Sequence, residues 1–115
     1  MASFKLTVRN GPKVWRENHE NLDEAIAALR RHAEAIRAEA DATEASAFRR
    51  KYEPGEQVMA RLEISTGGPF RGRDAGLDVM GDGSLVPFRG GVARKEISAE
   101  RDQAAYDAVR KALQG

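Results

Sequence analysis

The chain has 115 residues, which is enough for one hydrophobic core and too short for two independent ones. Its 19 basic and 18 acidic residues leave a net charge of +1, so it lacks the bulk positive charge of a dedicated binder of nucleic acid or of anionic membranes. It has no cysteine, which excludes disulfides, thiolate metal sites and cysteine nucleophiles. No window is apolar enough for a signal peptide or a membrane span. We therefore expect a single cytoplasmic domain spanning residues 1–115.

The N-terminal segment alternates apolar and polar residues, as a half-buried strand does. The apolar positions are Phe4, Leu6 and Val8. Asn10 and Gly11 both tolerate positive φ angles, which predicts a tight turn into a second strand over residues 13–17. Trp15, the only tryptophan, lies in that second strand. We expect its ring to cover an edge of the core, with anchoring of a partner as the alternative.

A long helix is predicted over residues 22–40. Asn21 is a favourable N-cap, and Glu24 at the third helical position completes the capping pattern. Apolar residues then recur at spacings of three and four and form one stripe. The stripe consists of Leu22, Ile26, Leu29, Ala33, Ile36 and Ala40. Because two of its members are alanines, which allow a close approach, we expect the helix to pack on a sheet rather than in a coiled coil.

Further strands are predicted after this helix. They span residues 47–53, 58–65, 77–79 and 85–97. Residues 81–84 form a turn rich in glycine, and the glycine pair Gly90 and Gly91 indicates a bulge or a close backbone approach within the last strand. Ser98 then caps a final helix that ends at Leu113. These elements predict an α+β fold in which about five or six strands form an antiparallel sheet, with the long helix on one face and the C-terminal helix closing an edge or an end.

The order of hairpin, long helix and antiparallel meander resembles the cystatin-like architecture, and Gln57-Val58-Met59-Ala60-Arg61 is similar to its QxVxG loop. The order of helix, three strands and helix also resembles a double-stranded-RNA-binding domain. The chain as a whole resembles short bacterial proteins of no assigned function. The segments that carry this resemblance are Leu6-Thr7-Val8-Arg9, Gly11-Pro12, Glu53-Pro54, Gly81-Asp82-Gly83-Ser84 and Gly91-Val92-Ala93-Arg94. These resemblances imply an architecture and no particular activity.

No motif in the chain singles out a catalytic or a metal site. The turn at residues 81–84 lacks the Gly-Lys-Ser/Thr of a phosphate-binding loop and the distal glutamate of a calcium loop. His19 and His32 are the only histidines, and their spacing does not match a helical metal pair, so we expect them to be separate exposed or helix-flanking residues. We predict no catalytic residue, no metal ligand and no cofactor.

Basic residues are the most suggestive feature of the second half of the chain. The candidate contacts to a nucleic acid or another anion are Arg49, Arg50, Lys51, Arg71, Arg73, Arg89, Arg94 and Lys95. Tyr52 or Phe70 would offer a stacking surface beside them. Acidic residues are interleaved, however, and cross-strand charge pairs on a solvated face are the favoured interpretation. Trp15 and Tyr52 are also candidate contacts to a protein partner.

Three functional hypotheses follow, in order of preference. The first is a non-catalytic interaction or structural module of the cytoplasm that acts through surface contacts, as a homodimer joined by sheet edges or by the uncovered sheet face. The second is an accessory protein that binds nucleic acid through an arginine-rich sheet face, with steep weakening of binding by salt. The third is a small-ligand binder or an enzyme, which would need a cavity lined by convergent polar groups.

Overall fold

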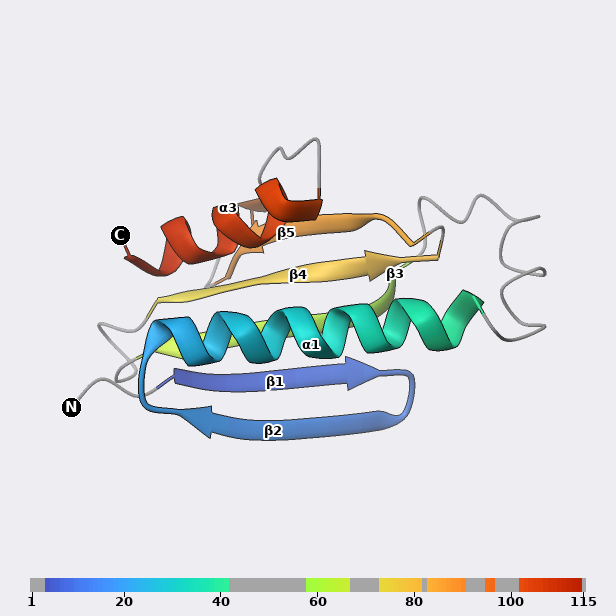
Figure 1. Ribbon diagram of the computed structural model, residues 1–115, viewed down its shortest axis with the longest axis horizontal. Coiled ribbons are helices and arrows are strands. Elements are labelled where there is room, and N and C mark those ends of the chain that lie inside the picture. Colours follow the sequence, from blue (N-terminus) through green and yellow to red (C-terminus); the bar gives the residue numbers. More distant parts are fainter. Residues whose placement is uncertain are drawn as a thin grey trace.

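The computed structural model describes residues 4–41, 58–66, 73–81, 83–90, 95–96 and 102–114 (Figure 1). In chain order the elements are β1 (Phe4–Asn10), β2 (Lys13–His19), α1 (Leu22–Asp41), β3 (Val58–Thr66), β4 (Asp74–Met80), β5 (Leu85–Arg89), β6 (Lys95–Glu96) and α3 (Asp102–Gln114). The strands form an antiparallel sheet in the order β2-β1-β3-β4-β5-β6. The predicted α+β fold, with the long helix on the sheet, is confirmed.

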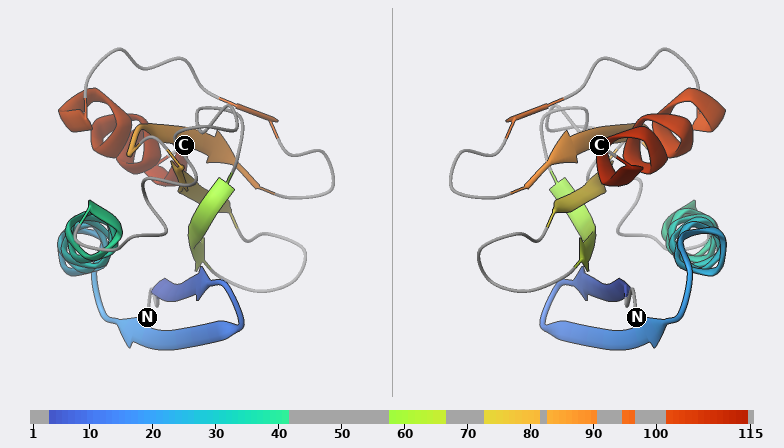
Figure 2. Two further views of the ribbon diagram at one scale, coloured as in Figure 1. Left: turned by 90° about the vertical axis from the view of Figure 1, so that its right-hand side faces the viewer. Right: turned by 90° about the vertical axis from the view of Figure 1, so that its left-hand side faces the viewer.

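Both helices lie on the same side of the sheet (Figure 2). Helix α1 contacts β1, β2, β3 and β4, and α3 contacts β4, β5 and α1. One hydrophobic core fills the space between the helices and this side of the sheet, and its members come from β1, β3, β4, β5, α1 and α3. The opposite side of the sheet is covered by no helix of the described ranges, and we call it the open face.

The first hairpin turns on Gly11 and Pro12, because Asn10 still pairs with Lys13 in the ladder. Gly11 has a φ of 63°, and glycine followed by a residue of negative φ is the combination of a type II′ turn. The predicted turn is therefore present, but Asn10 is not one of its two central residues. This turn gives β1 and β2 a regular register over their whole length.

Helix α1 begins and packs as its sequence predicts. The backbone N–H of Glu24 donates to Oδ1 of Asn21 over 2.8 Å, so Asn21 is the N-cap. Four predicted stripe residues are buried in the core, namely Ile26, Leu29, Ala33 and Ile36. Ala25 and Ala28 are buried as well, so the apolar face is wider than a single stripe and suits the broad surface of a sheet.

The segment from residue 85 to residue 97 is not the single strand that its sequence predicts. Strand β5 ends at Arg89, and β6 returns antiparallel to it with Phe88 opposite Glu96. The close approach predicted at the glycine pair is present at Gly90, whose N–H donates to the carbonyl oxygen of Asp74 over 2.7 Å. A Cβ at Gly90 would lie 2.7 Å from Cβ of Asp74, so the chain can pass here only without a side chain.

Two other predicted elements differ in extent or lie outside the described ranges. Strand β4 spans Asp74–Met80 and is longer than the predicted residues 77–79. The predicted strand over residues 47–53 and the predicted cap at Ser98 lie outside the described ranges. No helix of the described ranges combines the length and the apolar content that crossing a bilayer requires.

Candidate functional site

Three arginines of the open face converge on one hollow of about 460 Å³. Its lining residues are Thr7, Arg9, Arg16, Arg61 and Glu63. The strand register explains why they meet: Thr7 of β1 lies opposite Arg16 of β2 and opposite Glu63 of β3. Arg9, two residues after Thr7, lies opposite Arg61. Directly opposed side chains of a sheet point to the same side, so three strands contribute to one surface. We call this surface the arginine hollow.

Arg9 and Arg16 are the two arginines of the hollow that make no ion pair within the described ranges, and Glu63 is the acidic residue of its lining. Within the described ranges neither guanidinium forms an ion pair or a side-chain hydrogen bond, and both residues are exposed. The open-face positions of β1 and β2 carry no acidic residue at all: they are Lys5, Thr7, Arg9, Val14, Arg16 and Asn18. This half of the open face is therefore positively charged although the whole chain is nearly neutral.

Arg61 is held differently, by a buried acid directly opposite it on β4. Its Nε donates to Oδ1 of Asp78 over 2.9 Å, and Asp78 is only 2% exposed. The guanidinium also lies 5.7 Å from the ring centroid of Phe88, within cation–π distance. The side chain of Arg61 itself remains 40% exposed. Asp78 and Phe88 therefore fix the orientation of Arg61, which lines the arginine hollow together with Arg9 and Arg16.

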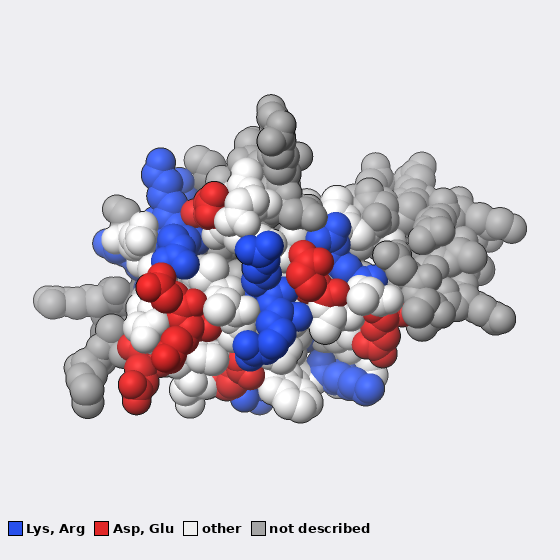
Figure 3. Space-filling view, in the orientation of Figure 1, with Lys and Arg blue, Asp and Glu red and all other residues white. Residues whose placement is uncertain are grey.

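The helix side of the molecule has a different charge pattern. Acidic and basic side chains alternate over α1 and α3, and neither sign forms a large continuous area on this side (Figure 3). Several of these charges pair with one another, such as Arg37 with Glu34 over 3.0 Å and Arg110 with Asp23. Mixed, mutually paired charges are typical of a solvated surface. The helix side is therefore a poorer candidate for binding an anion than the open face.

Glu17 joins the two histidines, which the sequence predicts to be separate. His19 Nε2 lies 2.8 Å from one carboxylate oxygen of Glu17, and His32 Nε2 lies 3.3 Å from the other. Arg31 adds a contact of 3.7 Å. Partial burial of Glu17 opposes its charged form, but the histidine hydrogen bonds and charges outweigh burial, and the pKa of Glu17 is lowered from 4.5. This cluster links β2 to α1.

Within the described ranges, no group of three or more His, Cys, Asp or Glu side chains has an arrangement that could hold a metal ion. The contacts at Glu17 are hydrogen bonds of one carboxylate to a histidine of its own strand and to a histidine of α1.

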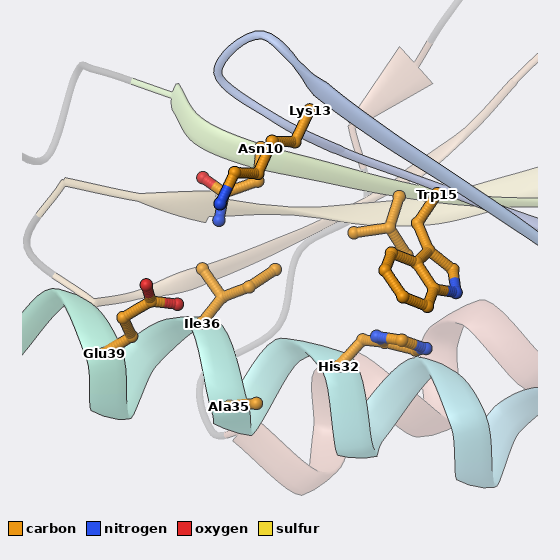
Figure 4. A pocket seen from close by; sticks show the side chains of 8 residues that line it. Asn10, Lys13, Trp15, His32, Ala35, Ile36 and Glu39 are labelled. Carbon is orange, nitrogen blue, oxygen red and sulfur yellow. The ribbon is translucent and has the colours of Figure 1, made fainter.

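A groove of about 220 Å³ lies beside this cluster, between the first hairpin and α1 (Figure 4). Its lining residues are Val8, Asn10, Lys13, Trp15, His32, Ala35, Ile36 and Glu39. Trp15 borders the groove with its ring tilted against His32, the ring centroids being 6.4 Å apart. Trp15 is 63% exposed, so it does not cover the core as its sequence context predicts. We call this feature the Trp15 groove.

The described members of the predicted basic set do not line the arginine hollow. Arg73 is exposed ahead of β4. Arg89 lies opposite Ala75, a core residue, and therefore belongs to the helix side of the sheet, with Lys95 opposite it on β6. The other predicted contacts lie outside the described ranges: Arg49, Arg50, Lys51, Tyr52, Arg71 and Arg94.

The convergence of Arg61 with Arg9 and Arg16 was missed because β3 lies far from β1 and β2 in the sequence. Arg9 and Arg61 each occupy a polar position of a clearly alternating segment, which was the available signal. Alternation indicates the side of the sheet on which a residue lies, but it does not indicate which strand lies next to it. Only the pairing of β1 with β3 brings Arg9 and Arg61 together.

Comparison of the chain with protein-family models, with curated proteins and with solved structures finds no match.

Proposed function

We propose that this protein is a non-catalytic cytoplasmic module that binds single-stranded nucleic acid through the open face of its sheet. The observation that carries the proposal is the convergence of Arg9, Arg16 and Arg61 on one hollow. Guanidinium groups bind phosphate oxygens through paired N–H donors, and two of these three have no ion pair within the described ranges. The hydroxyl of Thr7 adds a neutral donor between them.

The chemistry of this surface favours phosphates over bases as the groups that are recognised. Within the described ranges, Phe88 is the aromatic residue that Arg61 contacts on this face, and it is fully buried, so its ring is not available for a base to stack on. A single strand would then be held by its backbone, with little dependence on sequence and similar affinity for RNA and DNA. Three phosphate contacts predict a log–log salt slope of about −2.

The test is fluorescence anisotropy with labelled single-stranded RNA and DNA of mixed sequence, at several salt concentrations. We expect binding at low salt that weakens with the slope given above. The double variant Arg9→Gln/Arg16→Gln should lose most of the binding and reduce the slope to about −0.7. Arg61 is left unchanged, because its removal would take from the buried carboxylate of Asp78 the cation paired with it, and a loss of stability would then be confused with a loss of binding.

A matched control removes the same charge from the helix side. The double variant Arg31→Gln/Lys111→Gln loses two exposed cations that lie on α1 and α3, away from the open face. It should bind nucleic acid as the wild type does. Absence of binding by the wild type at low salt, or equal loss in both double variants, would overturn the proposal.

A further inference from the structure

Strand β2 is an edge strand with an unusually accessible free side. Among the described strands it has one neighbour, β1, with which it pairs without a break from Lys13 to His19. Because the two-residue turn makes Asn10 and Lys13 a hydrogen-bonded pair, the backbone groups of Lys13, Trp15 and Glu17 point toward β1. Those of Val14, Arg16 and Asn18 point away from the sheet. β2 thus offers a row of backbone donors and acceptors to a further strand.

We propose that β2 pairs antiparallel with β2 of a second copy, about a twofold axis that passes through Trp15. In this register Lys13 lies opposite Glu17 of the second copy, and the reverse pair forms by symmetry. The two Trp15 side chains lie opposite each other in a non-hydrogen-bonded pair, where side chains approach most closely. The dimer extends the proposed function, because its effect on nucleic-acid binding rests on that function.

Other symmetric registers are chemically worse. An axis through Arg16 or through Glu17 would place two like charges directly opposite each other, which destabilises a strand pair. An axis through Val14 would oppose Lys13 to Trp15 and leave Glu17 without a cross-strand cation. Of these registers, only the one with its axis through Trp15 places Lys13 opposite Glu17 and also places the two Trp15 side chains opposite each other.

The Trp15 groove is the second observation that points to a second copy. It lies on the helix side of β2, where Trp15 is 63% exposed (Figure 4) and where Val8 and Ile36 contribute apolar lining. Paired β2 strands would place the second Trp15 beside the first, between the α1 helices of the two copies. Dimer formation would then bury both exposed indole rings and both grooves. This burial supplies the apolar contact area that pairing of strand edges by itself lacks.

The pairing also has a consequence for the arginine hollow. A twofold axis perpendicular to the sheet leaves both open faces on the same side of the joined sheet. Val14 lies opposite Arg16 of the second copy, so the two Arg16 side chains are diagonal neighbours, with about 7–8 Å between them. Both hollows thus form one basic surface across the axis. A bound nucleic acid would neutralise this arginine pair and should favour the dimer.

The test uses the natural lack of cysteine. Trp15→Cys introduces the sole thiol of the chain at the proposed axis, where a non-hydrogen-bonded pair has the spacing of a disulfide. Under mild oxidation, without nucleic acid, we expect rapid formation of a covalent dimer. Val58→Cys places a thiol at another exposed apolar residue, 47% exposed against 63% for Trp15, on a different strand; it is the control and should cross-link far more slowly.

Light scattering of the wild type over a range of concentrations gives the second measurement. A dimer of twice 12.6 kDa is expected. Val14→Pro should shift the mass to that of the monomer while the far-ultraviolet circular dichroism stays unchanged, because the lost N–H points away from β1. A wild type that stays monomeric, or equal cross-linking of both cysteine variants, would overturn the dimer. Arg9→Gln/Arg16→Gln should lose nucleic acid but still dimerise, which separates failure of this proposal from failure of the proposed function.

Discussion

Strands β2 and β4 are both seven residues long, yet they differ in almost every property that decides what a strand does. Six of the seven residues of β4 are buried, on both sides of the sheet, whereas no residue of β2 is. The buried acid of β4, Asp78, is paired with Arg61. β2 carries the exposed tryptophan and one of the unpaired arginines. Stability is therefore expected to depend on β4, and contact with partners on β2.

The largest expected effect on stability is at Gly76, in the middle of β4. A Cβ at this residue would lie 2.0 Å from the carbonyl oxygen of Leu62, which belongs to the backbone of β3 and cannot move away. We expect Gly76→Ala to lower the free energy of unfolding by at least about 3 kcal/mol. Urea denaturation followed by circular dichroism measures this. A near-normal midpoint would show that β3 and β4 can separate locally without cost.

The same substitution in the two strands provides a direct comparison. Val79 of β4 is fully buried, whereas Val14 of β2 is 43% exposed. Val79→Ala should cost about 2–3 kcal/mol, the sum of lost apolar transfer and a cavity, and Val14→Ala less than about 0.5 kcal/mol. Equilibrium unfolding should be measured at low protein concentration, so that dimer formation does not contribute. Similar costs at both positions would contradict the contrast between the strands.

A smaller effect is expected at Gly11, in the turn that joins β1 to β2. No atom lies within 4 Å of the position that a Cβ would take, so space is not limiting there. The φ of 63° is unfavourable for any residue with a side chain, and Gly11→Ala should cost about 1–2 kcal/mol for this reason alone. Thermal unfolding measures the loss. Gly76→Ala creates a steric clash with the backbone, whereas Gly11→Ala only places alanine at an unfavourable φ. Gly76→Ala should therefore cause the larger loss of stability.

The smallest effect is a pH dependence at Glu17. Because its pKa is lowered in the folded state, Glu17 stabilises the fold above pH 4.5, and this contribution is lost as the pH falls through the folded-state pKa. Glu17→Gln should therefore be less stable than the wild type at pH 6, by about 1 kcal/mol or less, and the difference should shrink toward pH 3. Denaturation curves at several pH values check this. If the difference in stability grew on acidification, the pKa of Glu17 would be raised, not lowered, in the folded state.

Much of the fold could be predicted, because its signals are local. The alternation of β1 and β3, the N-cap at Asn21 and the stripe of α1 each depend on residues that are near in sequence. The reversal after β5, near Gly90, was missed because an alternating pattern does not show which strand a segment pairs with, and β6 pairs with β5. Local pattern indicated a special glycine there but not the direction in which the chain leaves it.

The candidate sites were harder to predict for the same reason. Arg9, Arg16 and Arg61 meet only because β1 lies between β2 and β3. His19 and His32 share Glu17 only because α1 packs beside β2. Trp15 was expected to cover an edge of the core, but it lies on an edge strand and is 63% exposed.

The position of β1 also has a consequence for the order of folding. The hairpin of β1 and β2 and the following helix α1 involve contacts between near neighbours and can form early. Strand β3, however, pairs with β1 only after residues 11–57 have been looped out, which carries a larger entropic cost. Formation of the pairing between β3 and β1 is therefore expected to limit the folding rate. Destabilising changes in β3 should slow folding, whereas changes in β2 should act mainly by speeding unfolding.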